Sequence, residues 1–339
     1  MPINGLIKKC ANISNMMYIA MLVIGLALPW FIHDNFLNRI LILTFFFIMF
    51  ATSWNLLAYS GQASLGHAAF LGIGGFASTM IVKQGITPVI GILIGASLAA
   101  FVGLLLGIIC VRLKEWFLGL VTFGFAIIMA AVINESSVFI NAINLALQSI
   151  GMAGNLDPHM FGGSLGIYSP HIVSQNQYYY LFFFTMMGTI LVTHLIFRSK
   201  IGIAFAAIRE NQEEARMMGI NTTKYKLIAF VISTFMAGFA GAIFAPYNYF
   251  INPEIFSIHY SFMPIIMTIS GGIGTIGGPI LGGLVINLIW EEMGMLGMTI
   301  DRLLVLGAIL VLEILFLPRG LIPLIKKLYA GVTSRGMPL

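Results

Sequence analysis

Residues 262–290 read FMPIIMTISGGIGTIGGPILGGLVINLIW, an apolar stretch that is interrupted at its centre by glycines and a proline. The stretch is long enough to cross a bilayer, since about 20 apolar residues suffice for one crossing. Glycine and proline both disfavour a regular helix, so residues 270–279 are not expected to continue one. We therefore predict two half-helices that meet at a glycine break. Such a break is tolerated at membrane depth only where protein or a water-filled cavity satisfies its backbone.

The rest of the chain has the composition of a membrane protein. Of its 339 residues, 59% are hydrophobic and 9% are charged, and the mean hydropathy is +0.98. Soluble proteins average roughly 25% charged residues, and a membrane β-barrel would show alternating segments of about ten residues instead of long apolar runs. We predict an all-α, polytopic transmembrane bundle of about 8–10 membrane segments. We expect residues 1–339 to form a single domain.

Long apolar runs predict where the chain crosses the bilayer. Besides the broken stretch, the predicted crossings are residues 16–32, 37–58, 64–82, 88–110, 116–133, 178–197, 227–249 and 303–317. Lys and Arg gather near the N terminus, after residue 110, within residues 198–226 and after residue 317, which predicts that these parts and both chain termini are cytoplasmic. Residues 134–177 contain no Lys or Arg and are expected to form an external region.

This orientation conflicts with a single crossing by residues 262–290. The run 227–249 begins inside and ends outside, whereas the basic tail after residue 317 lies inside. One straight helix between them would move that tail to the outside. The two half-helices are therefore expected to enter and leave the membrane from the external side, as a re-entrant pair.

The longest polar stretch, residues 198–226, reads RSKIGIAFAAIRENQEEARMMGINTTKYK. It holds six of the 17 Lys and Arg residues and three of the 12 acidic residues. Asn211 and Glu214 have the spacing of a helix N-cap and the residue that bonds back to it, and Gly219 stands where a left-handed residue ends a helix. These signals predict a helix at residues 212–218. So short a helix is unstable alone and suits a groove in another protein.

Several functional classes find no support in the sequence. No glycine is followed by lysine, so the chain has no P-loop for ATP. Residues 272–277 match G-x-G-x-x-G, but no βαβ unit surrounds them as a dinucleotide site requires. The histidines are scattered singly, and Cys10 and Cys110 have neither disulfide nor metal-ligand spacing. We expect no enzymatic activity, no cofactor and no metal.

The positions of the charged residues in the sequence lead to two further expectations. The basic residues gather at the predicted membrane edges, where they fix topology, so we expect no nucleic acid partner. Glu313 alone among the acidic residues falls inside a predicted crossing, whereas secondary transporters usually carry acids at their coupling sites. The energy for transport is therefore expected to come from another subunit.

Residues 54–76 are polar for their predicted depth. A path for a polar solute has these candidate lining residues: Asn55, Gln62, Ser64 and His67, with Gly271, Gly272 and Gly274 of the broken stretch. The alternative is that the polar side chains bond to one another, or to backbone freed near Gly61 and Gly66, as contacts worth about 0.6 kcal/mol each. Both interpretations stay open at this point.

Three stretches, taken together, resemble the motifs of one known family. They are YSGQASLGHAAF at 59–70, SKIGIAFAAIRENQEEARMMGIN at 199–221 and GGIGTIGGPILG at 271–282. In order and spacing they resemble the membrane permease subunits of branched-chain amino acid ABC transporters, specifically the LivM-like branch. The closing LPRGL at 317–321 is also similar. The resemblance covers residues 15–325.

The resemblance implies a channel-forming subunit of an ATP-driven importer, in the cell (inner) membrane, with branched-chain amino acids delivered by an external substrate-binding protein. The other implied partners are a homologous second permease, two ATP-binding cassette subunits and the lipid bilayer. Residues 198–226 are similar to the cytoplasmic coupling loop of importers, with its pattern E-A-A-x-x-x-G. Contacts with the ATPase are implied for Arg209, Glu210, Asn211, Glu213, Glu214, Ala215 and Gly219.

Two features depart from the family pattern. Glu214 occupies a position where alanine is commoner, and a glycine-rich piece at 162–166 follows an apparent insertion around residues 142–160. Related permeases move urea, short amides or other amino acids, so these solutes are alternative substrates. A self-contained secondary transporter or channel is the alternative from another class, and its uptake would survive ATP depletion.

Overall fold

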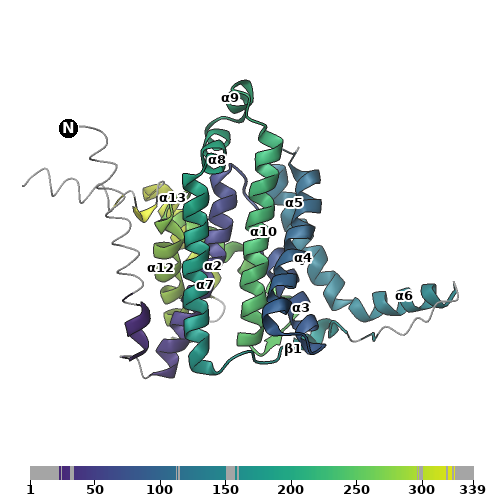
Figure 1. Cartoon of the computed structure of the whole chain (residues 1–339). Coiled ribbons are helices and arrows are strands. Elements are labelled where there is room, and N and C mark those ends of the chain that lie inside the picture. Colours follow the sequence, from purple (N-terminus) through teal and green to yellow (C-terminus); the bar gives the residue numbers. More distant parts are fainter. Residues whose placement is uncertain are drawn as a thin grey trace, which may run out of the picture.

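The computed structural model describes residues 23, 25–30, 34–111, 113, 115–149, 157–158, 160–295, 297, 301–317, 320–322 and 324. Within these residues the fold is a bundle of helices that run mostly side by side (Figure 1). A short antiparallel pair of strands, β1 (Ile167–Tyr168) and β2 (Phe250–Ile251), closes one end of the bundle. The predicted all-α polytopic class is confirmed.

Five helices among the described residues are long and apolar enough to cross a membrane. They are α2 (Asn35–Tyr59), α4 (Pro88–Cys110), α5 (Glu115–Asn134), α7 (Gln175–Arg198) and α10 (Thr222–Tyr247). Two shorter helices with apolar sequences, α3 (Ala68–Lys83) and α13 (Asp301–Phe316), match further predicted crossings. The predicted crossing at 16–32 lies mostly outside the described residues, and residues 25–30 within it are helical.

The two ends of the bundle differ. The short helices α8 (Lys200–Glu210) and α9 (Gln212–Met217) lie together at the top in Figure 1, which we call the α9 end. The opposite end, which we call the α6 end, carries the strands, the 3₁₀ turns η1 (Gly163–Leu165) and η2 (Pro253–Phe256), and α6 (Ser136–Ser149). Helix α6 extends sideways from the bundle and falls within the predicted external region.

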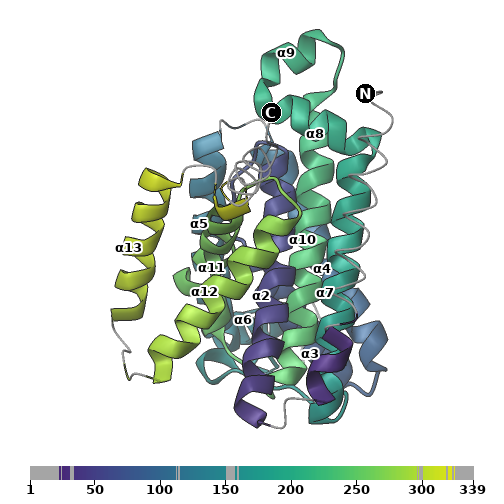
Figure 2. The same ribbon diagram turned by 90° about the vertical axis from the view of Figure 1, so that its left-hand side faces the viewer.

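The predicted glycine break is confirmed between α11 (Ile258–Gly271) and α12 (Gly277–Met295). The two helices form a hairpin whose open side lies at the α6 end, where the rings of His259 and Trp290 stack with centroids 4.3 Å apart (Figure 2). Close packing requires glycine at Gly282, because a Cβ there would overlap the carbonyl oxygen of Met267. The hairpin thus enters and leaves from one end, as predicted for a re-entrant pair.

The core lies around α2 and α10. The most apolar window of α2 is 89% buried and that of α10 is 67% buried, against 33% for α4, 28% for α5 and 39% for α7. Aromatic side chains join the two central helices, and the rings of Phe46 and Phe244 stack with centroids 4.2 Å apart. The peripheral helices therefore keep apolar side chains available for lipid or another subunit.

The predicted start of the third crossing differs from the structure at the end of the helix that lies beside the site. The crossing predicted to begin at residue 64 begins instead at Ala68, and Gln62 to Gly66 are not helical. Gly66 is pressed against α5, since a Cβ there would overlap the carbonyl of Thr122. The contact of Gly66 with α5 and the polar residues Gln62 and Ser64 are consistent with a turn here in place of the predicted helix.

Candidate functional site

Asn211 joins α8 to α9 and caps both helices. Its backbone N donates to the Ala207 carbonyl at 3.1 Å and closes α8. Its side-chain oxygen accepts from the backbone N atoms of Glu213 and Glu214, at 3.0 and 3.3 Å, and opens α9. These bonds satisfy donors that the first turn of a helix leaves free. The predicted N-cap is confirmed.

The return bond from Glu214 differs from the predicted capping box. The Glu214 carboxylate accepts from the side-chain amide of Asn211 at 2.6 Å. It does not accept from the Asn211 backbone, because that N–H already bonds to Ala207. The pair still orients the capping amide, but the preceding helix α8 changes which donor Glu214 reaches.

Gly219 ends α9 in the predicted left-handed conformation, with φ of +82°. The backbone N of Ile220 donates to the Ala215 carbonyl at 3.0 Å, and the N of Gly219 donates to the Arg216 carbonyl at 3.0 Å. Such bonds satisfy carbonyls that the last turn leaves free. Both ends of this six-residue helix are therefore fixed by local contacts.

Helix α9 turns one face to the protein and the other to solvent. Ala215 is buried, and Lys226 of α10 donates to the side-chain oxygen of Gln212, which ties α9 to the bundle. Met217 and Met218 are 89% and 86% exposed, an unusual degree for large apolar side chains. The exposed face of α9 thus combines acidic groups with two methionines, a surface suited to a protein partner.

Helix α8 was not predicted from the sequence. Its buried residues Ala204, Phe205 and Ile208 follow the three-to-four spacing of an amphipathic helix. That signal was available, but the charged residues around it favoured a loop. The helix matters for the site because it holds Arg209 against the bundle.

Arg209 connects α8 to the glycine break. Its guanidinium lies over the ring of Tyr59, 5.1 Å from the centroid, at the end of α2. It also packs against Gly274, where a Cβ would overlap Nη1 of Arg209. The ion pair with Glu210 at 3.3 Å is exposed and contributes little. Arg209 thus joins α8, α2 and the break between α11 and α12.

Asn55 satisfies the backbone of the glycine break. Its amide Nδ2 donates to the Thr275 carbonyl at 2.9 Å, and its Oδ1 accepts from the Gly274 backbone N at 2.7 Å. The break at Gly272 and Gly274 has φ values of +120° and +75°, so its polar groups cannot follow a helical pattern. A buried polar side chain of α2 replaces the missing helical bonds.

His67 and Gln62 bond to other helices inside the subunit. His67 is fully buried, and its Nε2 lies 3.0 Å from the Ser53 hydroxyl and 3.4 Å from that of Ser233. Gln62 donates to the Ser60 hydroxyl and to the Lys226 carbonyl, both at 2.9 Å. These bonds connect the turn between α2 and α3 with α10.

Ser64 is the fourth polar candidate. Its carbonyl accepts from Nε1 of Trp54 at 2.8 Å, and its hydroxyl is buried with no hydrogen-bond partner among the described residues. All four side chains are therefore buried inside the subunit, and those of Asn55, Gln62 and His67 bond to neighbouring elements. The path-lining role of these residues stays a prediction.

The glycine candidates also lie at contacts. Gly271 faces the α12 backbone, since a Cβ there would overlap the Gly278 carbonyl. Beside it, the Ser270 hydroxyl donates to the carboxylate of Glu313, the acid inside a predicted crossing. This bond ties α13 to the end of α11 and gives Glu313 a structural partner.

Comparisons with known proteins agree with these features. A family model described as "Branched-chain amino acid transport system / permease component" matches residues 36–314. The chain is 26% identical over 326 residues to the high-affinity branched-chain amino acid transport system permease protein LivM of Escherichia coli K12, covering 91% of this chain and 75% of that protein. LivM of Salmonella typhimurium gives 26% over 333 residues, with 92% and 76% covered.

A second group of relatives matches a shorter part. The permease protein LivH of Escherichia coli K12 is 30% identical over 138 residues, which is 41% of this chain and 44% of LivH. No solved structure is a significant match to the chain. The family model spans α2 to α13, including the capped helix and the glycine break. The chain therefore belongs to the family of permease components of branched-chain amino acid transport systems, and it is LivM-like.

Proposed function

We propose that the chain is the membrane-spanning permease subunit of an ATP-driven importer, which takes up branched-chain amino acids delivered by an external binding protein. The part of this proposal that concerns ATP rests on the structure of helix α9. This helix is capped at both ends by local bonds, and it presents Met217 and Met218 to solvent. A short rigid helix with an exposed apolar tip fits the cleft of a partner that hydrolyses ATP.

Arg209 supplies the route by which movement of α9 reaches the membrane. When two ATPase subunits close, they shift α8 and α9 as a rigid unit. Arg209 contacts both Tyr59 and the break at Gly274, so this shift acts on α2 and on the hairpin of α11 and α12. The chain itself carries out no chemistry on the solute, and ATP hydrolysis belongs to the partner subunits.

The proposed complex pairs this chain with a homologous second permease, two ATP-binding cassette subunits and the external binding protein. The similarity to both LivM and LivH supports a permease pair. In this assembly the α9 end faces the cytoplasm, and the α6 end faces the outside of the cell (inner) membrane. The candidate path residues around Asn55 and His67 lie between these two ends.

A pair of glycine substitutions tests the coupling role. Gly219 and Gly85 have φ values of +82° and +86°, and a Cβ at either meets nothing within 4 Å. Alanine at either position carries a similar backbone cost of about 1–2 kcal/mol. In the complete complex in proteoliposomes, we expect Gly219→Ala to lower substrate-stimulated ATPase activity and leucine uptake at least fivefold. Gly85→Ala, in the turn after α3, should leave both near the wild-type level.

A charge reversal adds a second arm to this test. Glu213→Lys places a cation on the exposed face of α9, and we expect the ATPase subunits to dissociate during purification. Uptake that persists in either the Gly219→Ala or the Glu213→Lys complex would contradict the coupling role. Uptake by the permease alone after ATP depletion would instead favour a secondary transporter. Competition with urea, acetamide and other amino acids distinguishes the alternative substrates.

A further inference from the structure

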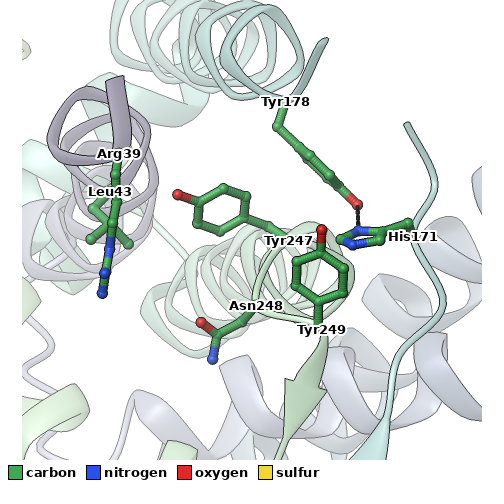
Figure 3. Close-up of a pocket in the computed structure, with 7 residues that line it drawn as sticks. All are labelled: Arg39, Leu43, His171, Tyr178, Tyr247, Asn248 and Tyr249. Atoms are coloured by element: carbon green, nitrogen blue, oxygen red, sulfur yellow. Dashed lines mark hydrogen bonds between the residues drawn. The ribbon is translucent and has the colours of Figure 1, made fainter. Parts of the chain in front are cut away.

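A pocket of about 270 Å³ lies between the start of α2 and the end of α10 (Figure 3), which are both at the α6 end of the bundle in Figure 1. Helices α2, α7 and α10 and the segments beside α7 and α10 form its walls, and α7 contributes Tyr178. Helix α2 contributes Arg39 and Leu43, and the segment before α7 contributes His171. The end of α10 contributes Tyr247, and the residues after it contribute Asn248 and Tyr249. The volume is near the lower limit of ligand pockets, which suits a small solute.

Arg39 gives the pocket a positive charge that forms no ion pair with any described carboxylate. Within the described residues, no ion pair or hydrogen bond to its guanidinium is present. Its position is also unusual, because Lys and Arg of membrane proteins favour the cytoplasmic side and this end is the proposed external one. Figure 3 shows the Tyr247 hydroxyl pointing to the Arg39 side of the pocket. Both groups are therefore free to bond to an anionic ligand.

The opposite wall is fixed by hydrogen bonds. The Tyr178 hydroxyl donates to the Pro246 carbonyl at 3.0 Å and accepts from the Ile172 backbone N at 3.2 Å. Nδ1 of His171 lies 3.3 Å from the same hydroxyl. These contacts hold the segment before α7 against the end of α10. The pocket is thus formed before any ligand enters.

The backbone conformation of Tyr249 is a second, independent feature of the pocket that is typical of ligand sites. It has φ of +60°, the one positive value for a residue other than glycine in the described part of the chain. Its carbonyl accepts from the Ser169 backbone N at 2.9 Å, which keeps the strained conformation in place. A bulky residue in this region costs free energy, and such residues cluster at ligand sites.

We propose that this pocket binds the carboxylate of a small solute at the external mouth of the permease. The Arg39 guanidinium holds the carboxylate, since its planar donors match two carboxylate oxygens. The Tyr247 hydroxyl donates a further bond, and Leu43 with the tyrosine rings accepts an aliphatic side chain. The placement of the pocket at the external side and the identification of the solute as a branched-chain amino acid rest on the proposed function, whereas the carboxylate site itself does not.

The test compares an acid with its amide. Isobutyrate and isobutyramide have the same shape, and only isobutyrate carries the charge that Arg39 recognises. With the full chain in lipid nanodiscs, saturation-transfer NMR should detect isobutyrate binding that is at least tenfold tighter than isobutyramide binding. Arg39→Gln should weaken isobutyrate binding about tenfold or more, and Tyr247→Phe should weaken it a few-fold. Lys83→Gln removes another exposed cation outside the pocket and should change binding less than twofold.

Defined results would overturn the proposal. Equal binding of acid and amide, or equal losses in Arg39→Gln and Lys83→Gln, would show that Arg39 does not select a carboxylate. No isobutyrate binding, together with weaker capture of the external binding protein by Arg39→Gln, would assign Arg39 to a protein carboxylate instead. If Arg39→Gln lowers thermal stability, the Arg39→Lys and Tyr247→Phe variants decide the question.

Leucine binding at the pocket, measured beside leucine uptake by the complete complex, distinguishes a failure of this proposal from a failure of the proposed function. If isobutyrate binds and leucine does not, the carboxylate site stands and its link to branched-chain amino acids is lost. If leucine binds at the pocket but the complete complex takes up no leucine, the proposed transport function fails while the pocket remains.

Discussion

At the scale of single residues, Asn55 explains how a broken helix can exist inside a membrane. Its two bonds, to Gly274 and Thr275, pair backbone groups that no helix satisfies. In lipid, no water is present to take over these bonds. Asn55 is fully buried, so its loss would leave both the donor and the acceptor of the break without a partner.

Asn55→Ala should therefore destabilise the permease by about 1–3 kcal/mol, the cost of leaving buried polar groups unpaired. We expect a lower midpoint of thermal unfolding for the purified chain in detergent. Asn141→Ala is the matched control, because Asn141 is exposed on α6. Similar midpoints for the two variants would show that Asn55 is not what holds the break.

The residue scale also shows what sequence can predict. The N-cap Asn211 and the left-handed Gly219 were identified correctly because capping is local and their partners lie within five residues, whereas the predicted bond from Glu214 to the Asn211 backbone was wrong. The pairing of Asn55 with Thr275 was not predicted, because 220 positions separate the two. The polar character of Asn55 was visible in the sequence, but its partner depends on how distant helices pack. The contact between Arg209 and Gly274 was not predicted for the same reason, because it also depends on how distant helices pack.

At the scale of elements, the hairpin of α11 and α12 depends on close backbone contact. Gly282 packs against the Met267 carbonyl, and Gly271 packs against the Gly278 carbonyl. Small residues let two helices approach in this way within a membrane. The glycines that break the helix and the glycines that pack it thus have separate structural roles.

Gly282→Ala should destabilise the hairpin, because a methyl group has no space there and overpacking costs about 1–3 kcal/mol. Gly188→Ala is the matched control in α7, since a Cβ at Gly188 meets nothing within 4 Å. Alanine favours a helix over glycine by about 1 kcal/mol, so Gly188→Ala should be neutral or stabilising.

Thermal unfolding of both variants measures this difference. Opposite shifts of the unfolding midpoint are expected, downward for Gly282→Ala and unchanged or upward for Gly188→Ala. A Gly282→Ala protein as stable as the wild type would mean that the two helices can move apart at no cost.

The bounds of helices were predicted well where one local sequence signal dominates. They were predicted poorly where contacts with distant residues determine where a helix begins. The bounds of α4 agree with the predicted crossing at both ends, because a proline opens the helix and its sequence is apolar throughout. The start of α3 was wrong, since Gly66 is held against α5. Helix α6 was missed within a region read as an external loop, although it is amphipathic along its length.

At the scale of the whole molecule, charge and hairpin together determine the topology. The six Lys and Arg residues of 198–226 lie at or near the α9 end, and the hairpin returns the chain to the α6 end before α13 begins. The number of complete crossings is therefore smaller than the number of apolar runs. Composition predicted a membrane bundle, and the re-entrant pair is the arrangement that would let residues 198–226 and the basic tail after residue 317, which lies mostly outside the described residues, face one side.

Cysteine labelling measures this orientation. In a chain whose Cys10 and Cys110 are replaced by serine, Met217→Cys and Leu165→Cys each present one thiol, at sites 89% and 82% exposed. A maleimide that cannot cross membranes should label Leu165→Cys in intact cells. It should label Met217→Cys only after permeabilisation. The reverse pattern would contradict the cytoplasmic position of α9 and the coupling role with it.

The bond between Asn55 and Thr275 also has a consequence for biosynthesis. A ribosome produces α2 long before residue 275, so the Asn55 amide enters the bilayer without the partner that it has in the finished protein. We expect the nascent chain to keep this amide shielded, by an insertase or by a temporary neighbour, until the hairpin arrives. Chains truncated before residue 274 would retain an unpaired amide in lipid, a defect that membrane proteases can detect and remove.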